Sequence, residues 1–267
     1  RNEGNSGIPD QDKKLQAHAE LEGLIRTYGT VLYQSDPNAP NQLYVVAQLH
    51  QGLDGSIHPY VPRCQLEILR IGQELARSRD LSFVVQEGDT FDISEDMEPK
   101  HNYTASRITP PSQIPDSILL KMLEEIARGG TSPRAEYLLA EDPGLPVYGA
   151  ENQALNELHA KFLLDRNPRA KELGFIRSGL TLLNTVKLGI KKVDEGTIQN
   201  MNALIIIGTN HIPEIYKIAA QGYFDHPAVP EISLPRSRIE IPLEELQMGV
   251  NFLMPNSVSE YHKSSAK

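Results

Sequence analysis

The sequence predicts an α/β fold with a central, mostly parallel sheet and helices on both of its faces. Short runs of β-branched and aliphatic residues indicate buried strands, and longer stretches with helical spacing of apolar residues separate them. The strands are expected at Leu43–Ala47, Leu81–Val85, Leu145–Tyr148 and Ala203–Ile207. Because strands and helices alternate along the chain, neighbouring strands should run parallel through crossover connections.

Apolar periodicity and turn residues predict the remaining elements. Helices are expected at Gln11–Arg26, Val61–Arg79, Asp116–Arg128, Ser132–Glu141, Gln153–Arg166, Pro168–Glu195 and Ile212–Gln221. Gly and Pro punctuate Tyr28–Asn41, which predicts a turn or a short edge strand. The last part of the chain should hold a weak strand at Arg238–Ile241 and a short helix from Leu243.

The composition fits one large domain. Of the 267 residues, 39% are hydrophobic and 23% are charged, which provides enough apolar material for a core. We expect residues 1–10 to form a flexible arm and residues 11–267 to form a single α/β domain. The polar, proline-containing connection at residues 92–115 should run over the surface, where it could serve as a lid. A boundary there would leave each part with too few strands for a sheet.

The charge and hydropathy of the chain limit its partners. The formal net charge is -9 and no basic stripe offsets it, so a small-molecule or peptide substrate is expected rather than nucleic acid. The longest apolar run, Ala203–Gly208, is far shorter than the ~20 residues of a transmembrane helix. The sequence starts with Arg1, which favours a processed, exported protein, periplasmic or extracellular, over a cytoplasmic one.

Polar side chains follow the predicted strands. His50 comes after the first strand, Glu87 after the second, Glu151 after the third and His211 after the fourth. The carboxyl ends of parallel strands share one edge of a sheet, where ligands bind, so these groups are expected to converge. Two imidazoles and a carboxylate are ligands of Zn, Mn, Fe or Co, which makes His50, His211 and Glu87 candidate metal ligands. The alternative for each residue is a turn role or an ordinary hydrogen bond.

Three further residues have competing interpretations. His58 lies in the loop after His50 and could reach the same crevice, although a solvated side chain is the simpler alternative. His159 lies beside Leu155 and Leu158 at helical spacing, which predicts a helix-surface or packing role. Cys64, the lone cysteine, lies within a predicted helix, where a small core residue is expected rather than a catalytic thiol.

The order of these motifs resembles the superfamily that includes the erythromycin esterases, the ChaN-like haem-binding lipoproteins and the TraB/Tiki proteins. The matching segments are Ala47–His50, with His58 and Gln65 after it, Phe83–Gly88, Tyr148–Glu151, Asp165–Asn167 and Leu204–His211. The first segment departs from the Gly-x-x-His pattern because Ala47 replaces the glycine, which leaves open whether the site is active. The resemblance covers about residues 43–221.

The resemblance implies a hydrolase that cleaves an ester or peptide bond, in some members with a divalent metal. Glu87 would act as general base on a water, with His50 and His211 as metal ligands or proton shuttles. Arg166 would hold an anionic substrate group, or it would form an ordinary salt bridge at a helix end. Glu151 and His58 would contribute to the substrate site.

Two alternatives remain open at this point. The ChaN-like branch implies a haem-binding protein without catalysis, for which Tyr60, Tyr103 and His58 are candidate axial ligands. A catalytically silent relative that serves as a structural or assembly component is the other alternative.

Overall fold

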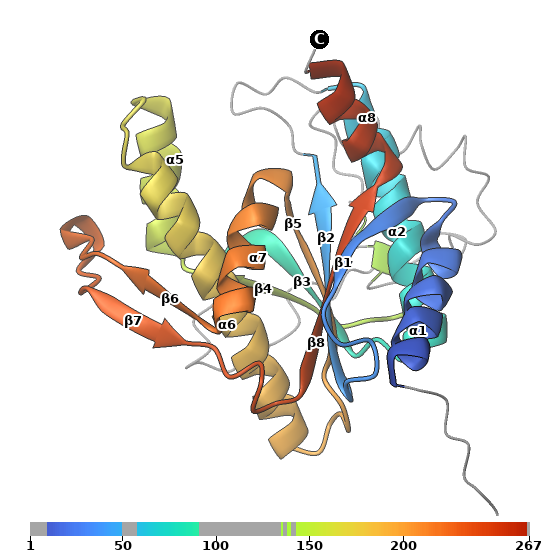
Figure 1. The fold of residues 1–267 in the computed structure, drawn as a ribbon. Coiled ribbons are helices and arrows are strands. Elements are labelled where there is room, and N and C mark those ends of the chain that lie inside the picture. Colours follow the sequence, from blue (N-terminus) through green and yellow to red (C-terminus); the bar gives the residue numbers. More distant parts are fainter. Residues whose placement is uncertain (1–9, 50–57, 91–134, 136–137, 140–142, 266–267) are drawn as a thin grey trace, which may run out of the picture.

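The computed structural model describes residues 10–49, 58–90, 135, 138–139 and 143–265 (Figure 1). Within these residues the protein is an α/β fold built on a six-stranded sheet with the strand order β1-β8-β2-β5-β3-β4. The predicted fold class is confirmed.

Five of the six strands run parallel and one edge strand runs antiparallel. The strands are β1 (Gly29–Gln34), β2 (Asn41–Gln48), β3 (Phe83–Thr90), β4 (Val147–Glu151), β5 (Asn202–Gly208) and β8 (Met248–Pro255). All four strands predicted as buried runs are present, and the expected edge strand is β1, which pairs antiparallel with β8. Strand β5 lies between β2 and β3, so the late apolar strand forms the middle of the sheet.

Helices cover both faces of the sheet (Figure 1). On one face lie α1 (Asp10–Ile25), α2 (Tyr60–Arg79) and α8 (Asn256–Ser265). On the other lie α6 (Ala170–Asp194) and α7 (Ile212–Gln221), with α5 (Gln153–Leu164) packed on α6. Because parallel strands in this arrangement are covered on both sides, their side chains are buried in an almost continuous run, as in β2 and β5.

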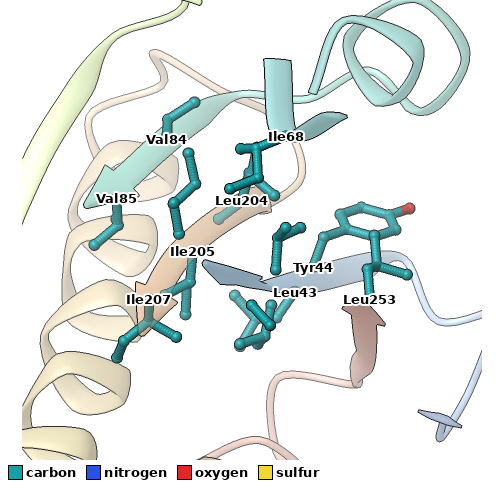
Figure 2. Packing of buried hydrophobic residues seen from close by; sticks show 14 of the residues in the cluster. Leu43, Tyr44, Ile68, Val84, Val85, Leu204, Ile205, Ile207 and Leu253 are labelled. Atoms are coloured by element: carbon teal, nitrogen blue, oxygen red, sulfur yellow. The ribbon is translucent and has the colours of Figure 1, made fainter. Parts of the chain in front are cut away.

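The core consists of two layers of aliphatic side chains on either side of the sheet (Figure 2). Ile68 of α2 packs in the layer that holds Leu204 and Tyr44, while Ile205 and Ile207 point to the opposite layer, under α6 (Figure 2). The alternation follows from the two-residue period of a strand. Side chains at odd positions of β5 therefore face α6, and this face carries the candidate site.

Local sequence features set the ends of the helices near that face. Asn152 caps α5, since its Oδ1 accepts the Leu155 N–H at 3.0 Å. Pro213 stands in the first turn of α7, where no backbone donor is needed. Gly222 ends α7 in the left-handed conformation, with φ of 73°, which a glycine adopts without steric strain.

Strand β8 and helix α8 correct the prediction for the end of the chain. The predicted short helix from Leu243 is wrong, because a turn at this point leads into β8 between β1 and β2. The polar residue Asn251 interrupts the apolar run of β8, so the sequence patterns did not predict this strand. The Asn251 side chain is nevertheless fully buried. Its side-chain amide donates to Gln42 Oε1 at 2.8 Å and accepts from Gln34 Nε2 at 2.8 Å, so the polar group is satisfied inside the core.

A second sheet lies outside the first, next to α7. It consists of β6 (Tyr223–His226) and β7 (Ser237–Glu240) in antiparallel pairing. Strand β7 confirms the weak strand predicted at Arg238–Ile241. Of the predicted arm at residues 1–10, the structure describes only Asp10, which begins α1. The connection at 92–115, the helix at 116–128 and most of the helix at 132–141 lie outside the described residues. Of the helices that the structure describes, none is long and apolar enough to cross a membrane.

Candidate functional site

The carboxyl edge of the sheet brings Glu87, Glu151 and His211 together. Glu87 follows Gln86 of β3, which pairs with Ile206 of β5, and Glu151 is the last residue of β4. His211 lies in the 3₁₀ turn Thr209–His211 that follows β5 directly. The three side chains thus reach one region on the α6 face from three different strands.

Glu87 connects the parts of this cluster. Its Oε2 accepts the backbone N–H of Gly208 at 2.5 Å. Its Oε1 lies 3.2 Å from Arg177 Nη2 and 3.4 Å from His211 Nε2. The side chain is 11% exposed, so both oxygens are held by protein donors with little water around them.

Arg177 of α6 is the cation of the cluster. Its Nη2 also donates to Oε1 of Glu151 at 2.5 Å, and the Glu151 side chain is 1% exposed. One guanidinium therefore neutralises two buried carboxylates that are far apart in the sequence. Among the described residues, Arg177 Nε has no hydrogen-bond partner. The arrangement satisfies the rule that buried charges need a partner, and it fixes α6 on the sheet.

His159 of α5 is a neutral member of the cluster. Its Nδ1 lies 2.6 Å from Arg177 Nη1, and because a guanidinium only donates, Nδ1 is the acceptor. Burial, together with the charges of Arg177 and His211, lowers the pKa of His159 to about 4. The predicted helix-surface or packing role is therefore incomplete: the ring is buried and holds the arginine.

His211 is charged, in contrast to His159. Burial alone would lower its pKa, but hydrogen bonds with Glu214 and Glu87 outweigh burial and raise it to about 9. Its Nδ1 lies 3.2 Å from Glu214 Oε2, so the imidazolium is held between two carboxylates. Burial would raise the pKa of Glu214, but its bonds to His211 and Ser178 lower it overall.

Ser178, His211 and Glu87 have the order of a nucleophile, a base and an orienting carboxylate. Ser178 Oγ lies 2.7 Å from His211 Nδ1, whose proton it accepts, and both Glu214 Oε2 and Gly174 O lie within reach of its own single proton. However, Ser178 is 0% exposed and lies within α6, so no substrate carbonyl can reach its oxygen. We therefore assign Ser178 to hold the imidazole and not to attack a substrate.

A cleft of about 600 Å³ lies beside the cluster, between the start of α6 and the start of α7. Glu214 lines this cleft and also touches His211, so it connects the cleft to the charged imidazole. Gly174 of α6 lies between the cleft residue Glu214 and His159, since a Cβ there would make ordinary contacts at 3.8 Å with Glu214 Oε1 and 3.5 Å with His159 Nε2.

The other candidate residues stand apart from this cluster. His50 lies outside the described residues. His58 is exposed, and its ring packs on Tyr60 and Tyr261 at centroid distances of 5.1 and 4.7 Å. Arg166 is exposed in the turn after α5, with φ of 53°, so the arginine of the cluster is Arg177 and not Arg166. Cys64 is a buried core residue as predicted, and burial raises the pKa of its thiol to about 12.

Two of the three expected metal ligands, Glu87 and His211, lie in this cluster, whereas His50 lies outside the described residues. The Arg177 guanidinium lies between Glu87 and Glu151 and donates to both carboxylates. His211 is held by Glu87 and Glu214, so both of its ring nitrogens have protein partners. Within the described ranges, no group of three or more His, Cys, Asp or Glu side chains is placed to hold a metal ion.

Sequence patterns missed the cluster members that come from helices: His159, Arg177, Ser178 and Glu214. One signal was present. Arg177 and Ser178 lie on the apolar stripe of α6, between Leu173 and Leu182, where a charged residue needs a buried partner. A helix whose buried stripe carries an arginine should therefore be paired with strand-end carboxylates.

Comparison of the chain with protein-family models, with curated proteins and with solved structures finds no match.

Proposed function

We propose that the protein hydrolyses an ester of a carboxylic acid, with Glu214 and His211 as the proton-transfer pair. The observation that carries the proposal is the His211 imidazolium, held between Glu87 and Glu214, of which Glu214 lines the cleft. Paired groups whose surroundings push their pKa values apart mark acid and base roles, and here the pKa of His211 is raised while that of Glu214 is lowered. The resemblance to the erythromycin esterases supports the same reaction class.

The reaction needs one proton to leave water and one to reach the alcohol. Glu214 is a carboxylate that borders the cleft, so it orients a water and accepts its proton as the water oxygen attacks the ester carbonyl. When the C–O bond of the tetrahedral intermediate breaks, His211 donates its Nδ1 proton to the leaving alkoxide, which becomes the alcohol, and Nδ1 is left without a proton. The proton on Glu214 then passes to His211 Nδ1, 3.2 Å away, which restores both groups.

Glu87 and Arg177 act through His211 and are positioning residues. Both Glu87 oxygens are engaged by Gly208, Arg177 and His211, which favours a holding role over the general-base role expected from the motif. Arg177 keeps Glu87 in place and is itself held by Glu151 and His159. No metal-dependent step is proposed, because Glu87 and His211 are engaged by protein partners and His50 lies outside the described residues.

The test compares two esters of one acid that differ in their leaving group. An alkyl ester needs a proton on its leaving oxygen, whereas a p-nitrophenyl ester does not. His211→Gln should lower kcat/KM for the alkyl ester by about 10²–10⁴-fold and affect the p-nitrophenyl ester much less. Glu214→Gln should slow both esters, because it removes the acceptor for the water proton.

Glu245→Gln is the matched control, since Glu245 is exposed in the turn before β8, away from the cluster. Equal losses for both esters in His211→Gln would overturn the acid role. Cleavage of a peptide substrate, with no ester turnover, would redirect the proposal to the peptidase alternative.

A catalytically silent protein is the second candidate, and the burial of the cluster favours it. Glu151 is 1% exposed and Arg177 is 8% exposed at the side chain, as in a purely structural ion pair. In that case the wild type would cleave neither ester nor peptide, while replacement of Arg177 would still lower stability. The two candidate functions thus predict different hydrolytic activities for the wild type, but the same loss of stability when Arg177 is replaced.

A further inference from the structure

The cleft between α6 and α7 has a mixed lining that points to a ligand class. Its walls are Pro168, Lys171, Glu172, Phe175, Ile176, Pro213, Glu214, Lys217 and Pro227. The volume of about 600 Å³ falls in the range of small-molecule sites, roughly 300–1,000 Å³. An apolar wall and a few charged groups are the usual composition of such a site.

The charged side chains of the cleft differ in whether they are paired. Glu172 lies 3.4 Å from Arg169, which Glu231 shares at 2.6 Å, and Glu214 pairs with His211 at 3.2 Å. Lys171 and Lys217 form no salt bridge with any residue that the structure describes. The cleft therefore presents two lysines outside any salt bridge of the described residues, although the chain as a whole carries a formal net charge of -9.

The two lysines stand next to an apolar surface. Lys217 Nζ lies 5.6 Å from the centroid of the Phe175 ring, within cation–π distance. Phe175 is half-buried and Ile176 is buried, so the ring offers a face to a ligand while the isoleucine supports it. The lining includes three prolines, whose fixed φ angles limit rearrangement of the cleft wall.

We propose that this cleft binds a small amphipathic anion, with its apolar part on Phe175 and its anionic group between Lys171 and Lys217. Glu214 repels an anion, so the ligand should place its uncharged part next to Glu214 and its charge at the lysines. In terms of the proposed function, on which this step rests, the substrate is an ester that carries a separate anionic group. The binding of the anion itself does not depend on hydrolysis.

Two dyes with the same ring system test the binding in the full chain. 8-Anilinonaphthalene-1-sulfonate carries a sulfonate, whereas N-phenyl-1-naphthylamine lacks it, and both change fluorescence in an apolar site. The wild type should bind the sulfonate dye more tightly. The double variant Lys171→Met/Lys217→Met should lower the affinity for the sulfonate dye by about 5-fold or more and leave the affinity for the neutral dye unchanged. Both lysines are exposed, so the fold should survive the change.

Lys187→Met is the matched control, because Lys187 is an exposed lysine of α6 outside the cleft. Phe175→Ala should weaken both dyes, since it removes the shared apolar contact. An unchanged affinity of the sulfonate dye in the lysine double variant, or an equal loss in Lys187→Met, would overturn the inference.

The outcomes separate this inference from the proposed function. Lysine-dependent dye binding without ester turnover would leave the anion site standing and overturn the hydrolase. Turnover of neutral and anionic esters at equal kcat/KM, without lysine-dependent dye binding, would leave the hydrolase standing and overturn the anion site.

Discussion

Arg177 donates to Glu151 across 2.5 Å at a position where the carboxylate is 1% exposed. The same nitrogen lies 3.2 Å from Glu87, so one arginine from the longest helix holds two strand ends. A pair this deeply buried is costly to form, but removal of one partner costs more, because it leaves a charge without compensation. The cluster is therefore a stability element, whatever chemistry it performs.

Arg177→Met is expected to lower the free energy of unfolding by about 3–5 kcal/mol, because Glu87 and Glu151 would lose their counter-ion. Urea unfolding followed by circular dichroism measures the change. Arg238→Met is the control, since Arg238 and Asp225 form a similar two-bond pair with side chains 57% and 58% exposed. That variant should lose less than about 1 kcal/mol. Equal losses in the two variants would contradict the buried role of Arg177.

The stability of the protein should fall in alkaline solution because of His211. Its pKa is about 9 in the folded protein and near 6.5 in the unfolded chain. The contribution is therefore fully present below pH about 6.5 and is lost as the pH rises through 9. At roughly 1.4 kcal/mol per pKa unit, it amounts to about 3 kcal/mol. His211→Gln should flatten the dependence of the unfolding free energy on pH between these values, and an unchanged slope in the variant would contradict the assignment.

The acid side should show the opposite dependence through His159. Its folded pKa is about 4, below the value of 6.5 in the unfolded chain. The unfolded chain therefore binds a proton first, and stability falls as the pH drops from about 6.5 to 4. His159→Gln keeps a hydrogen-bonding group near Arg177 without this titration, so its unfolding free energy should depend less on pH in this window. A wild-type slope retained in the variant would contradict the assignment.

Gly249 of β8 should tolerate no side chain. A Cβ at this position would lie 2.2 Å from the Asp36 backbone oxygen, and backbone cannot move aside as easily as a side chain. Gly249→Ala is expected to destabilise the protein by about 1–3 kcal/mol. Gly23→Ala is the paired control, because nothing lies within 4 Å of a Cβ there and alanine favours the helix α1. Its expected effect is a gain of about 0.5–1 kcal/mol. Thermal unfolding of the two variants should thus shift in opposite directions.

The sequence patterns predict the parallel strands well because burial on both faces leaves a continuous apolar run, as at Ala203–Ile207. They fail at β8, where Gly249 and Asn251 interrupt the run. Both residues are required by contacts with parts of the chain that are distant in sequence. The Asp36 backbone approaches Gly249 closely, and the side-chain amide of Asn251 forms hydrogen bonds inside the core. Local sequence patterns therefore miss a strand such as β8, whose residues are determined by contacts with distant parts of the chain.

The candidate site divides in the same way. Glu87 and His211 follow directly from strand order, since residues after parallel strands share one edge. Arg177 and Glu214 come from helices, and their direction toward the site depends on how α6 and α7 pack on the sheet. The protonation states of His211 and His159 depend in turn on these helix residues, so they become apparent only with the packing.

Glu214 faces two environments, since it borders the cleft and holds His211. Occupancy of the cleft and protonation of the imidazole are consequently linked quantities, and such linkage is reciprocal. A ligand that draws Glu214 away weakens the hold of His211 on its proton. Loss of that proton, in turn, releases the Glu214 carboxylate from His211 and so favours binding of the same ligand. Through Glu214, the pKa of the buried His211 ring therefore depends on whether a ligand occupies the cleft.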